Sequence, residues 1–147
     1  MTNRVMGESW ELFDAATGRH VGVSDQRGNE QLTVNLAVRT VDANTTVLPG
    51  DSDGLVVLPS TAAAARTWTI APVGSAAGQQ LYDLGQITTF VNDSATYSVT
   101  LAGGSGVRLT SLGDGKNGNF TIAPKGGCTA VMIATDVWMV SGKGATN

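Results

Sequence analysis

Clusters of glycine, asparagine and aspartate interrupt this chain at short intervals, and they constrain its fold more than any other feature. The 147 residues include 19 glycines. The main clusters are residues 50–54, 103–106, 113–118 and 126–127. Because Gly, Asn and Asp adopt positive φ at little cost, we expect turns there. The intervening runs of about 4–10 residues are rich in Val, Thr, Ile and Leu, which is typical of strands. The sequence therefore predicts an all-β fold.

Alternation of apolar and polar residues is clearest over residues 31–41, which predicts a strand with one buried face. The apolar positions of that face are Leu32, Val34, Leu36 and Val38. Residues 97–101 and 107–112 also alternate, and the Gly-rich segment between them predicts a β-hairpin.

Two closing strands are expected at residues 129–135 and 136–140. Residues 130–134 form an unbroken apolar run, which is typical of a strand buried on both faces. Only residues 61–66 hint at helix, and they are too few to hold one in isolation. We therefore expect a single turn of helix or a loop there.

One short repeat occurs in the chain. Trp68-Thr69-Ile70-Ala71-Pro72 returns as Phe120-Thr121-Ile122-Ala123-Pro124. Each copy reads as an aromatic strand that ends at proline, because proline cannot donate to a continuing ladder. A duplicated β unit would explain the repeat. So would two strands of one sandwich that meet the same constraints.

The first part of the chain differs in sequence pattern from the rest. Trp10 to Phe13 and His20 to Val23 are followed by a turn signal at residues 25–29. We expect residues 1–41 to form an N-terminal arm and β-hairpin region. Residues 42–147 are expected to form the main β-sandwich or jelly-roll-like domain, with one continuous domain as the alternative.

Charge is scarce. Charged residues make up 14% of the chain, against about 25% in ordinary globular domains. The net charge is −3, and the nine Lys and Arg residues are scattered singly. Nucleic-acid binding and polybasic membrane anchoring both need clustered cations, so we predict neither. The first residues lack the apolar core of a signal peptide, and no apolar run approaches the ~18 residues of a membrane span, so we expect synthesis in the cytoplasm.

No set of residues in the sequence completes a reactive site. His20 and Cys128 are the only residues of their types, and neither catalytic nor zinc sites form from so few groups. Residues 51–54 resemble the start of a calcium loop, but no Glu follows Glu30, and a calcium loop needs a later bidentate Glu. Residues 113–116 lack the Ser or Thr of a phosphate loop. We predict no catalytic, cofactor-binding or metal-ligating residues, and no enzyme activity.

Three tryptophans offer two interpretations. They are Trp10, Trp68 and Trp138. Exposed on a β face, they could stack on sugars; within apolar strand patterns, they are more typical of a core or a subunit interface. We favour the core or interface. Glycosylation sequons at Asn44, Asn92 and Asn119 lack a secretion signal and are read as chance matches.

From Asp53 to Gly142 the chain resembles virion accessory proteins of tailed bacteriophages. The resemblance rests on a Val-Val-Leu-Pro strand end at residues 56–59, a small-residue stretch at 61–66, the Trp-Thr-Ile strand at 68–70 and a closing tryptophan strand at 134–142. This pattern is similar to capsid decoration (cement) proteins and to head-fibre or tail-appendage modules.

The resemblance implies a structural virion protein that decorates and stabilises a phage capsid. Such proteins coat an icosahedral head as a homotrimer, so the implied partners are the major capsid protein and further copies of this chain. The implied location is the capsid surface of the virion, after synthesis in the host cytoplasm. Low charge suits a chain that buries much of its surface in interfaces. We expect residues 1–13 and exposed edge strands to make these contacts. The alternative is an appendage adhesin that binds a host-surface glycan.

Overall fold

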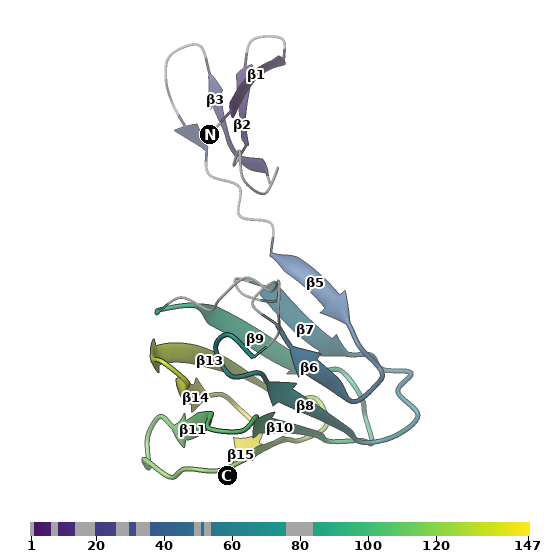
Figure 1. Ribbon diagram of the computed structural model, residues 1–147. Helices are drawn as coiled ribbons and strands as arrows, with labels where there is room; N and C mark the ends of the chain where they lie inside the picture. The colour runs from purple at the N-terminus through teal and green to yellow at the C-terminus, as the bar shows by residue number, and fades with distance from the viewer. Residues whose placement is uncertain are drawn as a thin grey trace. The chain divides into compact units, whose positions relative to one another are not determined.

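The computed structural model describes residues 2–6, 9–13, 20–25, 30–31, 36–48, 51, 54–75 and 84–147. The chain is all-β, which confirms the predicted fold class. It divides into two compact units, Met1–Leu36 and Ala37–Asn147 (Figure 1).

The first unit is an antiparallel sheet of four strands in sequence order. The strands are β1 (Thr2–Met6), β2 (Ser9–Phe13), β3 (His20–Asp25) and β4 (Glu30–Gln31). Strands β3 and β4 pair antiparallel, as the expected turn between them requires. Residues 26–29 of that turn lie outside the described residues. The predicted arm and hairpin region spans residues 1–41, whereas this unit spans residues 1–36.

The second unit packs two sheets against each other. The six-stranded sheet has the order β11-β14-β13-β9-β7-β5, and the five-stranded sheet has the order β15-β12-β10-β8-β6. The strands of the first are β5 (Ala37–Thr40), β7 (Gly54–Leu58), β9 (Ile87–Asn92), β11 (Arg108–Ser111), β13 (Gly127–Ala134) and β14 (Val137–Ser141). Those of the second are β6 (Thr45–Val47), β8 (Arg66–Ile70), β10 (Val99–Gly103), β12 (Phe120–Ile122) and β15 (Ala145–Thr146).

The chain alternates between the two sheets from β5 to β12. Strands β5, β7 and β9 are therefore parallel neighbours in one sheet (Figure 1). Strands β6, β8 and β10 are parallel neighbours in the other. Each pair of strands makes one circuit around the core, and the β13–β14 hairpin then completes the six-stranded sheet.

The core lies between the sheets and takes every second side chain of the central strands. Trp68 on β8 and Phe90 on β9 meet across the sandwich, with ring centroids 6.0 Å apart. Trp68 is 0% exposed and Trp138 is 1% exposed. The prediction placed the tryptophans in the core or at a subunit interface, and these two lie in the core. Trp10 lies in β2, and its side chain lies outside the part of the structure that is described.

The predicted hairpin over residues 97–112 is wrong. Strands β10 and β11 lie in different sheets, so their connection crosses the end of the sandwich. Backbone bonds anchor this crossing: Gly104 N–H donates to Ile70 O at 2.9 Å, and Val107 N–H donates to Gly104 O at 3.0 Å. A Cβ on Gly103 would collide with Val107 O, so the close approach of the two backbones requires glycine.

The predicted strand at residues 31–41 is also wrong in its buried face. Strand β4 ends at Gln31 and β5 begins at Ala37, in the other unit. Leu32 and Val34 lie outside the described residues. Leu36 is 48% exposed and Val38 is 62% exposed. The reason is that β5 is an edge strand on which the side chain facing the core is that of Arg39, so Val38 faces outward.

Strand β13 corrects a further expectation. Residues 130–134 do form a strand, but only Ala130 and Met132 are buried, and Ile133 is 55% exposed. A two-layer sandwich leaves one face of each sheet on the outside, so a strand within it has one buried face. The second apolar face of β13 points away from the core.

The repeat receives a structural explanation. Strands β8 and β12 flank β10 on its two sides, and Trp68 and Phe120 both pair with Leu101. They run in opposite directions, because β8 is parallel to β10 and β12 is antiparallel to it. The shared inward positions account for the similar residues.

Candidate binding surfaces

The candidate reactive residues do not come together in a described site. Cys128 lies on β13 in the core, and burial raises the pKa of its thiol to about 12. His20 begins β3 in the first unit. Among the described residues, no three His, Cys, Asp or Glu side chains gather into a group that could hold a metal ion.

The buried thiol gives a first prediction. At pH 8 a thiol with a pKa of about 12 is ionised in only about one molecule in 10,000, and the thiolate is the reactive form. We expect Cys128 to resist alkylation in the native protein and to react fully in denaturant. Mass spectrometry after timed exposure to iodoacetamide measures this. Rapid labelling of the native protein would contradict the buried position.

The segment that resembles the start of a calcium loop is held by an ion pair at Asp51. Asp51 Oδ2 accepts hydrogen bonds from Arg39 Nη2 at 2.7 Å and from Leu48 N–H at 2.9 Å. Arg39 Nε lies 2.7 Å from the other carboxylate oxygen. The side chain of Asp51 is therefore committed to joining β5 to the segment after β6, which leaves it unsuited to ligate a cation. Ser52 and Asp53 lie outside the described residues.

Two other sequence motifs are structural. Residues 113–116 form an exposed turn, and the next element is strand β12 rather than the helix that a phosphate loop requires. Backbone bonds from Ser111 N–H to Lys116 O and from Gly118 N–H to Leu109 O close this turn. The sequon residue Asn92 is 1% exposed and hydrogen-bonded within the core.

The outer side of the six-stranded sheet is apolar over its four central strands, whereas the exposed Arg108 of the edge strand β11 pairs with Val137 at one margin. Its central strands β7, β9, β13 and β14 place eight large apolar side chains on that side, half-exposed or exposed. Strands β7 and β9 supply Leu55, Val57, Ile87 and Val91. Strands β13 and β14 supply Val131, Ile133, Val137 and Met139. The other outward positions are Thr89, Gly127, Thr129, Ala134 and Ser141. We call this surface the outer apolar face; none of its residues is charged.

Lateral pairing makes these side chains one continuous surface. Ile87, Val131 and Met139 are register partners across three neighbouring strands. Leu55, Thr89 and Thr129 form the adjacent row, in which the two threonine hydroxyls lie 3.3 Å apart. Val38 extends this row to the edge strand β5.

The five-stranded sheet has a different outer side. There Thr67, Thr100, Thr121 and Thr146 are register partners across β8, β10, β12 and β15. This row follows the usual rule for a sandwich, in which side chains on the solvent side are polar. The two sheets share one core and one fold, so the apolar character of the other outer side is not a requirement of the fold.

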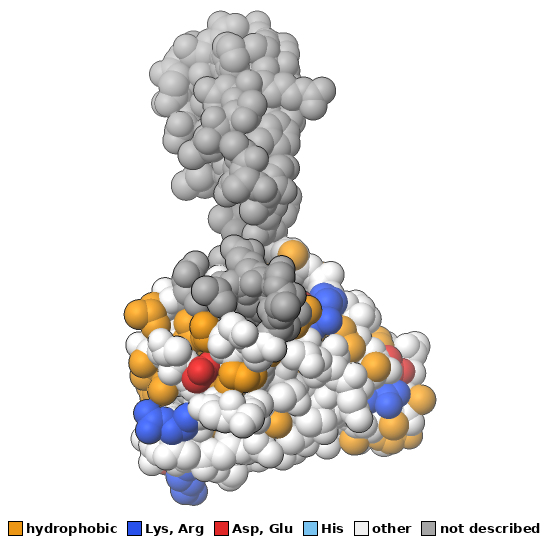
Figure 2. Space-filling model, viewed as in Figure 1, with side chains coloured by type: hydrophobic (Ala, Val, Ile, Leu, Met, Phe, Trp, Pro, Cys, Tyr) orange, Lys and Arg blue, Asp and Glu red, His pale blue; other side chains and the backbone are white. Residues whose placement is uncertain are grey.

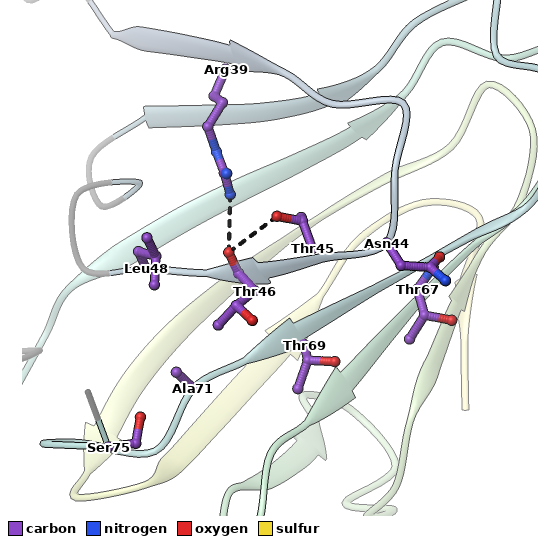
Figure 3. A pocket seen from close by; sticks show the side chains of 9 residues that line it. All are labelled: Arg39, Asn44, Thr45, Thr46, Leu48, Thr67, Thr69, Ala71 and Ser75. Carbon is purple, nitrogen blue, oxygen red and sulfur yellow. Dashed lines mark hydrogen bonds between the residues drawn. The ribbon is translucent and has the colours of Figure 1, made fainter. Parts of the chain in front are cut away.

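A groove lies at the β6 edge of the five-stranded sheet, with a volume of about 870 Å³ (Figure 3). Its lining is mostly hydroxyl-bearing: Thr45, Thr46, Thr67, Thr69 and Ser75, with Arg39, Asn44, Leu48 and Ala71. Arg39 reaches from β5 toward β6, and its Nη2 donates to Thr46 O at 3.2 Å (Figure 3). Because Asp51 neutralises Arg39, the groove favours an uncharged polar ligand over an anion.

Charged side chains are few and scattered over the described part of the face seen in Figure 2. The described residues contain no helix that is long and apolar enough to cross a membrane.

These features define an all-β sandwich with an apolar face on the outer side of one sheet and a polar groove at the β6 edge of the other. Comparison of the chain with protein-family models, with curated proteins and with solved structures finds no match.

The outer apolar face was missed by reasoning from the sequence, although a signal for it is present. Residues 130–134 are apolar at both odd and even positions, and so are Leu55 to Leu58. A strand with one buried face needs apolar residues only at every second position. At residues 130–134 this excess predicts burial on both faces, whereas the structure places Val131 and Ile133 on the outside.

Proposed function

We propose that this protein is a structural virion protein that decorates and stabilises a phage capsid by binding the assembled shell as a trimer. The observation that carries the proposal is the outer apolar face. A broad uncharged surface of Val, Leu, Ile and Met resembles the core of a protein–protein interface, where charged residues are depleted. Residues 53–142 resemble phage accessory proteins, and this resemblance suggests that the partner is a capsid.

The mechanism is linkage between binding and shell stability. A protein that binds the assembled shell, and not its dissociated subunits, stabilises the shell by its binding free energy. At a free concentration 100 times the dissociation constant, this amounts to about 2.7 kcal/mol per site. A trimer engages several capsid subunits at once, so its second and third contacts form at high effective concentration.

The test measures the mass of the oligomer and whether the protein binds to capsids. We expect light scattering to give three times the 15.1 kDa chain mass, and we expect the protein to co-sediment with undecorated heads built from the capsid protein of the same genome. Decorated heads should retain their DNA at temperatures that open bare heads. Serum albumin at equal concentration controls for trapping. A monomer that stays in the supernatant would overturn the proposal.

A second candidate function rests on the groove. Its hydroxyl, amide and backbone groups suit the hydrogen-bonding pattern of a neutral sugar, as in an adhesin that binds a host-surface glycan. Its nine lining residues include no aromatic side chain, and Trp68 and Trp138 are buried, so neither provides a platform on which a sugar could stack. Glycan-array binding that is lost in Thr69→Val and retained in Thr121→Val would favour this function over decoration.

A further inference from the structure

We propose that the ion pair between Arg39 and Asp51 guards the free edge of β6 against the addition of a further strand. Strand β6 ends the five-stranded sheet, and the polar groove opens at this edge. The backbone of an end strand is a template for pairing with another chain, and natural sheets block such edges with charged side chains. This inference goes beyond the proposed function, because it concerns an edge of the sandwich and not the outer apolar face.

The backbone groups that face the free edge of β6 are those of Thr46 and Leu48. Val47 O accepts a hydrogen bond from Ala71 N–H at 3.5 Å, so the backbone of Val47 faces the neighbouring strand β8. Successive residues of a strand direct their N–H and C=O groups to alternate sides, so those of Thr46 and Leu48 face away from β8. Thr46 O and Leu48 N–H are therefore the acceptor and the donor that one residue of a parallel neighbouring strand would bind.

The ion pair occupies both of these groups. Arg39 Nη2 donates to Thr46 O at 3.2 Å (Figure 3). Asp51 Oδ2 accepts from Leu48 N–H at 2.9 Å. The two side chains also bind each other, with Arg39 Nη2 2.7 Å from Asp51 Oδ2 and Arg39 Nε 2.7 Å from Asp51 Oδ1. The guanidinium and the carboxylate thus supply the donor and the acceptor of one strand residue, but they present no strand edge of their own.

The place of Arg39 in the sandwich supports this role. Arg39 lies on β5, the end strand of the other sheet, and its register partner on β7 is the buried Val56. The side chain of Arg39 is therefore directed inward, although it is 36% exposed, and that of Asp51 is 7% exposed. An aliphatic residue would fill this position without the desolvation that an ion pair requires. A charge directed inward at a sheet edge is one of the devices that prevent edge-to-edge pairing.

The experiment removes this ion pair and compares the result with a matched removal nearby. The guard variant, Arg39→Met with Asp51→Ala, frees the two edge groups and keeps the net charge. The control variant, Arg66→Met with Asp42→Ala, breaks the 2.9 Å ion pair between β8 and the segment before β6. In sedimentation equilibrium of the full chain, we expect the guard variant to associate beyond the wild-type mass. Its association constant should exceed that of the wild type and of the control by about tenfold or more.

A third variant adds Thr46→Pro to the guard variant and separates edge pairing from misfolding. Proline removes an N–H group from the free edge, so it blocks strand addition by a different chemistry. Association of the guard variant that Thr46→Pro returns to the wild-type level supports the inference. A guard variant that stays at the wild-type mass overturns it, as does association that the control shares or that Thr46→Pro leaves intact. A guard variant that loses its strand signal in circular dichroism also overturns it, because the ion pair would then serve folding. Each variant is compared with the wild-type mass, so the result is separate from whether the wild type is a trimer that binds heads.

Discussion

Trp68→Ala should lower the free energy of unfolding by about 3–5 kcal/mol. The indole is fully buried between the sheets, where it contacts Phe90 of the opposite sheet and lies beside Leu101. Truncation to alanine removes the favourable free energy of burying the indole. It also leaves a cavity that the two paired sheets cannot close. Urea unfolding followed by far-UV circular dichroism measures the change.

Trp68→Phe separates cavity formation from loss of the indole. The Trp68 Nε1 has no hydrogen-bond partner among the described residues, so removing it uncovers no orphaned acceptor. We therefore expect Trp68→Phe to cost about 1–2 kcal/mol, well below the alanine variant. Thr121→Ala on the exposed side of β12 should stay within about 0.5 kcal/mol. Equal losses for Ala and Phe would contradict a packing role.

Asn92→Leu should destabilise the protein by about 3 kcal/mol or more, although leucine has the same branched arrangement of heavy atoms. Asn92 ends β9 in the six-stranded sheet, and its Nδ2 donates to the carbonyl oxygens of Tyr97, Ile122 and Ala123 at 2.8, 3.1 and 3.0 Å. Its Oδ1 accepts from Ser94 N–H at 3.1 Å. Leucine leaves these buried backbone groups without this partner.

Asn117→Leu is the matched control. Asn117 is exposed, and its Oδ1 accepts one hydrogen bond, from Thr110 Oγ1 at 2.6 Å. Because water replaces a lost partner at an exposed site, this variant should cost less than about 1 kcal/mol. Thermal unfolding of both variants under the same conditions compares them. A small cost for Asn92→Leu would mean that the carbonyl groups find other donors and that Asn92 does not hold the two sheets together.

Local chemistry was enough to predict several of the strands and turns. The alternation at residues 137–141 and the glycines at 113, 115 and 118, all with positive φ, are properties of a few neighbouring residues. The aliphatic and aromatic content of the strands likewise identified Trp68 and Trp138 as core residues. The scarcity of His and Cys is a property of the composition, and it favours the hypothesis of a binding function.

Only the tertiary structure decided which strands pair and which apolar residues remain outside. Residues 97–112 carry the local signature of a hairpin, yet β10 and β11 belong to different sheets, because the chain circles the core instead of reversing within one sheet. Apolar residues at 130–134 specify a strand, but the number of layers around it determines whether its second face is buried. The sandwich has two layers, so Val131 and Ile133 face outward, and the clusters of glycine and the strands between them encode no information about what covers them.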